Sequence, residues 1–211
     1  MDRRRFLKRA GLFGAKLFII STPFLSLPLF RNTAAAELRL SVKNWYIRTV
    51  EFITPSINTV EFRLDVTGMA EKPYELKYDD LEKLQDAEYV RDFNCVEGWT
   101  VPDVKWSGIK LSTLMKKATP NADARFVNIY CSGGKYTESI TIEEAMDDEN
   151  ILATHIEGHP LEVKHGFPAR IFMPKKYGYK SPKWVVRMEL SDERITGFWP
   201  ERGYDIDGDY I

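Results

Sequence analysis

The sequence has 211 residues, of which 44% are hydrophobic, with 30 Lys and Arg against 31 Asp and Glu. This length supports one well-packed domain, because two domains would each be small. Residues 1–36 hold seven of the basic residues and one Asp, so residues 37–211 carry a net charge of −7. That balance argues against a general nucleic-acid or anionic-membrane surface, and any basic site must be local.

Residues 1–36 differ in character from the rest of the chain. The twin-arginine export pattern Arg-Arg-x-Phe-Leu-Lys occupies residues 3–8, and an apolar stretch, residues 17–30, precedes Ala34–Ala36. This stretch contains Pro23 and Pro28 and is shorter than the roughly 20 residues that a spanning helix requires. We therefore predict a twin-arginine signal peptide over residues 1–36, with cleavage after Ala36 favoured over a retained membrane anchor, and a periplasmic location for residues 37–211. The twin-arginine route carries folded proteins, so a cofactor inserted in the cytoplasm can travel with them.

The remaining chain reads mainly as strands. Residues 59–67 alternate apolar and polar side chains, as a half-buried strand does, and further strands are expected at 125–131, 151–156, 168–174 and 183–190. Short helices are expected at 78–84, at 111–118 and after the capping box Thr141-Ile142-Glu143-Glu144. Neither a repeat nor a strand–helix–strand alternation is visible. The pattern predicts a sheet-rich, mixed α+β single domain over residues 37–211.

Cys95 follows a strand-like segment at residues 89–93 and precedes the turn sequence Glu97-Gly98-Trp99. Backbone amides in such a turn are free to face a ligand. A thiolate is a soft metal ligand and also a nucleophile, whereas many free cysteines are simply core residues. Cys131 is the second cysteine, so a disulfide between the two is formally possible, although a ligand thiolate cannot also form a disulfide.

The amino-acid sequence around Cys95 resembles that of a known protein family. Cys95-Val96-Glu97-Gly98-Trp99, followed by residues 104–109 and 111–114, resembles the sulfite oxidase family of molybdopterin-dependent oxidoreductases. It is most similar to the branch of bacterial periplasmic methionine sulfoxide reductase catalytic subunits, where a Cys-Val-Glu-x-Trp segment carries the molybdenum ligand. The resemblance implies the family's fold, a molybdenum-molybdopterin cofactor, and Cys95 as both the metal ligand and the catalytic centre.

A second informative region concentrates basic side chains in an otherwise acidic domain. It contains His165, Arg170, Lys175, Lys176, Lys180 and Lys183. On charge alone this is either a solvated edge or a local anion site, and a pterin phosphate needs such donors.

The sequences His-Gly-Phe-Pro-Ala-Arg at 165–170 and Tyr-Gly-Tyr-Lys-Ser-Pro-Lys-Trp at 177–184 resemble the family's pterin-binding signature. The resemblance implies cofactor contacts from His165, Arg170, Ser181, Pro182 and Lys183. Two further candidates are Arg48, in a segment loosely similar to the family's Phe-x-Arg-Asn entry, and Ser132, before two glycines.

The departures from the family pattern bear on the reaction. Sulfite oxidases follow their cysteine with a basic run, whereas here Glu97 and Trp99 supply an acid and an aromatic ring, which disfavours sulfite. No Cys-x-x-Cys-His haem motif occurs in the sequence, so electrons are expected from another protein. The resemblance implies an enzyme that reduces an S-oxide or N-oxide, methionine sulfoxide first, with a membrane cytochrome or quinol-linked subunit as partner.

Three alternatives stay open. The first is sulfite oxidase-like oxidation of a small oxyanion, and the second is a non-catalytic binding module on the same fold. The third is a cysteine hydrolase with Cys95 as nucleophile and His165 as base, although no orienting third residue is visible. Metal analysis of the exported protein separates these classes.

Export through the twin-arginine machinery predicts that replacing Arg3 and Arg4 by Lys traps the precursor in the cytoplasm with its cofactor still bound. Cell fractionation followed by molybdenum analysis measures this outcome. An unchanged periplasmic yield would refute the predicted location.

Overall fold

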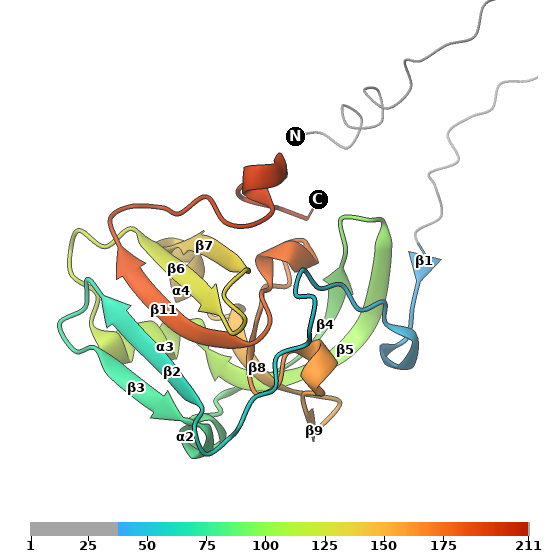
Figure 1. Ribbon diagram of the computed structural model, residues 1–211, viewed down its shortest axis with the longest axis horizontal. Coiled ribbons are helices and arrows are strands. Elements are labelled where there is room, and N and C mark those ends of the chain that lie inside the picture. Colours follow the sequence, from blue (N-terminus) through green and yellow to red (C-terminus); the bar gives the residue numbers. More distant parts are fainter. Residues whose placement is uncertain (1–37, 211) are drawn as a thin grey trace, which may run out of the picture. The chain divides into compact units, whose positions relative to one another are not determined.

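Two mixed β-sheets form the framework of the computed structural model, which describes residues 38–210 (Figure 1). Sheet A contains β1 (Leu38–Arg39), β4 (Ala87–Asn94), β5 (Trp99–Lys110), β8 (Ile151–Ile156), β9 (His159–Pro160) and β10 (Arg170–Phe172). Sheet B contains, in spatial order, β3 (Tyr74–Lys77), β2 (Arg63–Gly68), β11 (Val185–Ser191), β6 (Phe126–Cys131) and β7 (Thr137–Thr141). The predicted signal peptide over residues 1–36 lies outside the described residues.

Short helical elements connect these strands. They are α2 (Tyr78–Lys83), α3 (Leu111–Ala118), α4 (Ile142–Met146), and the 3-10 turns η1 (Val42–Asn44), η2 (Val163–His165), η3 (Gly178–Lys180) and η4 (Pro200–Arg202). The expected capping box begins α4, because the Thr141 hydroxyl accepts the Glu144 N–H and the Glu144 carboxylate accepts the Thr141 N–H. No helix within residues 38–210 has the length and apolar character needed to cross a bilayer.

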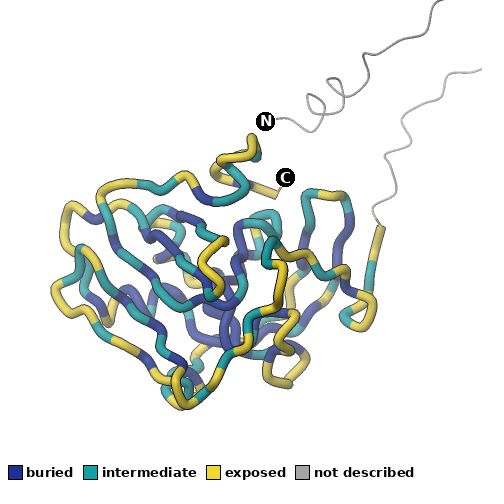
Figure 2. The backbone as a smooth tube through the Cα atoms, viewed as in Figure 1, coloured by how far each residue is buried: buried dark blue, intermediate teal, exposed yellow. Residues whose placement is uncertain are grey.

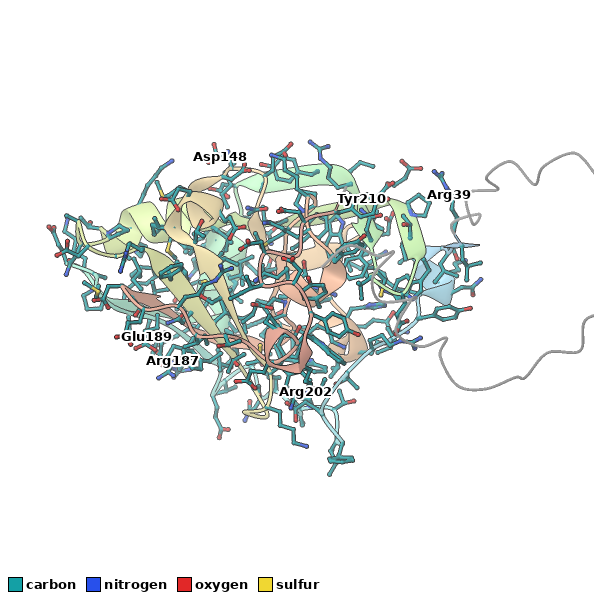
Figure 3. The ribbon with its side chains drawn as sticks, turned by 90° about the horizontal axis from the view of Figure 1, so that it is seen from above. Arg39, Asp148, Arg187, Glu189, Arg202 and Tyr210 are labelled. Atoms are coloured by element: carbon teal, nitrogen blue, oxygen red, sulfur yellow. The ribbon has the colours of Figure 1, made fainter. Side chains whose placement is uncertain are left out.

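Strand β11 is the centre of sheet B. It pairs in parallel with β2 and antiparallel with β6, so that Met188 lies opposite Val66 on one side and Ile129 on the other. All three side chains are buried, whereas Arg187 and Glu189 of the same strand point outward (Figure 3). This alternation is the period of two that a sheet with one covered face produces.

Strand β5 has the same central position in sheet A. It pairs antiparallel with β4 and β8, and its first residues pair in parallel with β1. At the crossing with β8, a Cβ on Gly108 would lie 2.1 Å from the Leu152 carbonyl oxygen, so the close approach requires glycine. The β4–β5 hairpin ends at the Cys95 turn, which therefore stands on a rigid base.

The interior contains two hydrophobic clusters. The larger packs the inner face of sheet B against the apolar side of α3, where Leu111, Leu114 and Met115 are buried. The smaller is strongly aromatic and includes Trp45, Phe93, Trp99, Trp106 and Phe172. Figure 2 shows the buried backbone concentrated along the central strands, with the exposed backbone in the connections. The aromatic cluster forms the base on which the candidate site is built.

A buried ion pair joins η3 to sheet B and to the C-terminal segment. The ammonium group of Lys180 donates to the Glu138 carboxylate at 2.7 Å and to the Ser139 and Ile206 carbonyl oxygens, both at 2.8 Å. Neither Lys180 nor Glu138 is exposed to solvent. Buried charges are tolerated only with such partners, so this pair fixes the C-terminal segment over the end of β7.

The predicted α+β, sheet-rich class is confirmed, and two strand boundaries are corrected. Residues 59–61 form a turn, so β2 begins only at Arg63. Asn58 is the cause, because its side-chain oxygen accepts the Val60 N–H at 3.0 Å and its carbonyl oxygen accepts the Phe62 N–H at 2.8 Å. The strand expected at 168–174 is shortened to β10, since prolines at both ends of that range have no N–H to donate.

Candidate active site

A pocket of about 260 Å³ gathers most of the residues singled out in the sequence. Its wall includes Arg48, Cys95, His165, Arg170, Ser181, Pro182 and Lys183. Ser132 is not among the lining residues and instead borders a separate hollow beside Arg63 and Val186. The Ser132 N–H donates to the Trp184 carbonyl oxygen at 2.8 Å, so its backbone closes the end of a β-ladder.

Cys95 is the half-buried first residue of the turn between β4 and β5. Its N–H donates to the Trp99 carbonyl oxygen at 2.9 Å and its carbonyl oxygen accepts the Gly98 N–H at 3.0 Å. Gly98 adopts a φ of 89°, which favours glycine at the tip of this turn. Burial raises the pKa of the Cys95 thiol to about 11, although the Glu97 backbone N–H opposes that rise. The free thiol is therefore protonated at neutral pH, which disfavours an activated nucleophile and leaves room for a metal to stabilise the thiolate.

Arg170 is the buried cation of the pocket. Its guanidinium donates to three backbone carbonyl oxygens, those of Ser181 at 2.8 Å, His165 at 3.1 Å and Ile171 at 3.3 Å. The group also lies over the rings of Phe93, Trp106 and Trp45, at 5.1, 5.7 and 5.9 Å from their centroids. Burial lowers the pKa of Arg170 to about 10, yet the group stays charged at neutral pH. Within residues 38–210 no carboxylate pairs with it.

Lys183 and His165 stand beside Arg170. The Lys183 ammonium group donates to the Lys164 carbonyl oxygen at 3.0 Å, and no salt bridge to it occurs in the described part of the chain. Burial, with the charge of Arg170, lowers the pKa of Lys183 to about 7 and that of His165 to about 4. His165 is therefore neutral at neutral pH. An anion placed here would reverse the effect on Lys183 and hold its proton.

The other basic residues of this region have carboxylate partners. Lys175 contacts the carboxylates of Asp147 and Glu149, and Lys176 contacts those of Glu144 and Asp209. Lys180 is the buried partner of Glu138 described above. Apart from the neutral His165, the basic cluster of the sequence thus divides into three paired lysines and two basic groups, Arg170 and Lys183, that line the pocket without a carboxylate partner in residues 38–210.

The charged side chains beside Cys95, Arg48 and Glu97, form an ion pair with each other. The Arg48 guanidinium binds the Glu97 carboxylate through contacts of 2.7, 2.8 and 2.9 Å, and the Trp99 indole N–H donates to the same carboxylate at 2.9 Å. The hydrogen bond to Arg48 lowers the pKa of Glu97. Arg48 therefore lines the pocket as the partner of Glu97.

Several pocket residues were missed by reasoning from the sequence. They are aromatic side chains that complete the wall: Trp45, Tyr46, Tyr136, Tyr179, Trp199 and Tyr204. The aromatic richness of residues 41–52 was a signal for the first two. For Trp199 and Tyr204 the signal was the family resemblance of Gly197-Phe198-Trp199 and Arg202-Gly203-Tyr204, for Tyr179 it was the segment at 177–184, and for Tyr136 the sequence gives only its place two residues after Gly134.

The two thiols remain separate. Cys131 is buried at the end of β6, and both cysteines are free, so the possible disulfide is absent from the described residues. No group of three or more His, Cys, Asp or Glu side chains within residues 38–210 is arranged to hold a metal ion.

Comparison with known proteins identifies the family of the chain. The model of the oxidoreductase molybdopterin binding domain matches residues 51–199. The chain belongs to this family. The prediction of a molybdopterin-dependent oxidoreductase is thereby confirmed, and the pocket built around Cys95 and Arg170 is the candidate active site of such an enzyme.

Individual relatives agree with this assignment. An Azospira oryzae protein with the provisional name protein-methionine-sulfoxide reductase subunit YedZ1 is 31% identical over 149 residues, which is 71% of this chain and 56% of that protein. The protein-methionine-sulfoxide reductase catalytic subunit MsrP of Campylobacter jejuni is 28% identical over 226 residues, covering 94% of this chain and 76% of its own. The chain therefore spans little more than half the length of the Azospira relative.

A solved structure shares the fold. The sulfane dehydrogenase SoxCD of Paracoccus pantotrophus superposes with a TM-score of 0.61 at 22% sequence identity, covering 68% of this chain and 41% of that chain. At this identity the likeness establishes the architecture of the domain.

The pocket fits the cofactor that the family name implies. Arg170 is a buried cation and Lys183 lies half-buried beside it, both without a carboxylate partner in the described residues, and such groups are stabilised by a bound anion such as a pterin phosphate. Cys95 presents a soft sulfur donor in the same pocket, the kind of ligand that suits molybdenum held by dithiolene sulfurs. His165, Ser181 and Pro182 shape the wall between these groups.

Loss of the buried cation provides one test. Charge-assisted hydrogen bonds contribute about 1.5 to 3 kcal/mol each, so Arg170→Ala should weaken cofactor retention at least about tenfold and lower the melting temperature of the loaded protein. Lys175→Ala is the matched control, since Lys175 is exposed and paired with Asp147 and Glu149. Pterin content and thermal unfolding report the result. Identical behaviour of the two variants would reduce the basic region to a solvated edge.

The cysteines provide a second test. A hydroxyl is a poor ligand for a thiophilic metal, so Cys95→Ser should abolish turnover while the pterin is retained. Cys131→Ser, at a buried residue that does not line the pocket, should leave turnover within about twofold of the wild type. Molybdenum content, pterin content and activity are measured on each variant. Full activity of Cys95→Ser would contradict its role as the metal ligand.

Proposed function

We propose that this protein is an exported molybdenum enzyme that reduces methionine sulfoxide with electrons from a membrane partner. One observation carries the proposal. The Cys95 thiol shares its pocket with two cations that suit the anionic part of a pterin, while the charges next to the thiol are already neutralised by the Arg48–Glu97 pair. The names of the Azospira and Campylobacter relatives support the same reaction.

Each residue has a separate task in this proposal. Cys95 is the protein ligand to molybdenum, and Arg170 with Lys183 binds the phosphate of the pterin. His165, neutral at the working pH, donates or accepts a hydrogen bond without adding charge. Ser181 has its hydroxyl engaged by the Met173 N–H at 3.2 Å, so it holds the loop that brings Pro182 and Lys183 to the pocket. When bound, the cofactor supplies two-electron oxygen-atom transfer.

The surroundings of Cys95 favour a neutral substrate. Arg48 is occupied by Glu97, so no unpaired cation of the described residues stands beside the thiol to attract sulfite. The aromatic residues Tyr46, Trp99 and Trp199 offer apolar contact to the methyl and methylene groups of a thioether. In the overall reaction a sulfoxide takes up two electrons and two protons and yields a thioether and one water.

The proposal also includes the source of the electrons and the cellular location of the protein. A membrane cytochrome or quinol-linked subunit supplies the reducing equivalents, because the sequence holds no haem-attachment motif. The arginine pair at residues 3 and 4 addresses the chain to the twin-arginine machinery, which exports it in folded form to the periplasm.

The substrate assignment is tested with reduced viologen as an artificial donor. Molybdenum-loaded protein should oxidise viologen with methionine sulfoxide or another sulfoxide, and its kcat/KM should exceed that for sulfite with cytochrome c by at least about tenfold, because sulfite lacks a cationic partner near Cys95. An N-oxide serves as the comparison substrate. Faster turnover of sulfite than of every sulfoxide would reverse the assignment, and loaded protein inactive on all of them would favour a binding module.

A further inference from the structure

Residues 45–53, here called the rim segment, run along the pocket without forming a helix or a strand. Three anchors hold it in place. Trp45 is 8% exposed, with its ring 4.5 Å from that of Phe93. Arg48 is bound to Glu97 as described above. The Glu51 carboxylate accepts the Lys135 N–H at 3.3 Å and packs on Gly133, where a Cβ would lie 2.7 Å from it. The rim segment is therefore fixed at both ends of its path along the pocket.

The rim segment ends in two exposed apolar side chains. Phe52 is 96% and Ile53 85% exposed, the highest values for large hydrophobic residues within residues 38–210. Val50 and Glu51, immediately before them, line the pocket. The Lys135 ammonium group lies 4.1 Å from the centroid of the Phe52 ring and supports it. Figure 3 shows this part of the chain, drawn pale blue, projecting from the body of the molecule.

Two adjacent, fully exposed apolar residues next to a functional pocket mark an interaction site better than scattered ones do. Their backbone is already positioned by the Glu51 anchor, so little ordering is needed when a partner covers them. Phe52 and Ile53 have no cluster of unpaired basic side chains beside them in the described chain. Arg48 is bound to Glu97, and Lys135 is the only cation that contacts Phe52 within residues 38–210. A lipid surface is recognised by clusters of several basic residues, which this pattern does not provide.

We propose that Phe52 and Ile53 form a docking surface for the apolar residues that flank an oxidised methionine in a polypeptide. The proposal rests on the proposed function. Methionine is an apolar residue that occurs mostly among other apolar residues, so a polypeptide that presents its sulfoxide carries apolar neighbours with it. Residues 45–51 of the rim segment line the pocket, so the residues beside a sulfoxide that reaches the site lie over the rim. Free methionine sulfoxide has no such neighbours.

The test compares two substrates on the molybdenum-loaded protein. The double variant Phe52→Ser, Ile53→Ser should raise KM for an unfolded, methionine-oxidised polypeptide by about tenfold, because the apolar area buried on docking is lost. Its KM for N-acetylmethionine sulfoxide and both kcat values, with reduced viologen as donor, should stay within about twofold. Val60→Ser is the control, since Val60 is 80% exposed but is not among the lining residues of the pocket. Thermal unfolding verifies that all variants fold.

A binding measurement makes the result independent of turnover. Fluorescence anisotropy of the labelled oxidised polypeptide should show about tenfold weaker binding to the double variant and unchanged binding to Val60→Ser. Equal effects on both substrates, or a loss seen only when the native membrane donor replaces viologen, would overturn the docking surface. In the second case the surface serves the electron donor. Absence of any sulfoxide turnover by the wild type would refute the proposed function, while the anisotropy would still decide the docking surface.

Discussion

The buried guanidinium of Arg170 is the constraint on which the site depends. A charge removed from water is costly unless hydrogen bonds and nearby polarisable groups compensate it. Here three carbonyl oxygens and three aromatic rings surround the group, and they come from η2, from β10, from the loop after η3 and from the aromatic cluster. The same arrangement fixes those loops around the pocket and leaves the positive charge for an anion. In the proposed function, structural support and ligand binding are therefore tasks of one side chain.

The pocket separates charge into two regions with different chemistry. The Arg170 region is cationic and buried, and burial lowers the pKa of Lys183 to about 7, which weakens its hold on a proton until an anion arrives. The Cys95 region is neutral, since Arg48 and Glu97 cancel each other and burial keeps the thiol protonated. A ligand with an anionic end and a metal end fits such a pocket in one orientation. In the proposed function the neutral region faces the substrate, which suits a sulfoxide better than sulfite.

The rim segment connects this chemistry to the surface. Its anchors Trp45 and Arg48 contact Phe93 and Glu97 of the pocket wall, and Glu51 is held by the Lys135 N–H, so the position of Phe52 is tied to the geometry of the site. Helices and strands supply the rigid base, and an irregular segment supplies the specific contacts. This division is common where a scaffold positions functional loops.

The sequence by itself determined the local elements and the chemistry available to them. Strong signals were correct: α3 spans Leu111–Ala118 and β8 spans Ile151–Ile156, both as expected, and the capping box of Thr141 begins α4. The order of residues around Cys95 and Arg170 also identified the family. Local hydrogen bonding and side-chain periodicity act over a few residues, so they can be read from a short stretch of chain.

Only the tertiary structure decided which charges remain available for a ligand. Arg48 and Glu97 are 49 positions apart, and Lys180 and Glu138 are 42 apart, so no local pattern predicts either pair. Such pairing engaged three of the lysines near Arg170 with carboxylates and left Arg170 and Lys183 at the pocket. Ser132 was one of the predicted cofactor contacts, yet in the folded chain it borders another hollow. Electrostatic and packing partners are chosen by proximity in space, and that proximity exists only after the two sheets have folded.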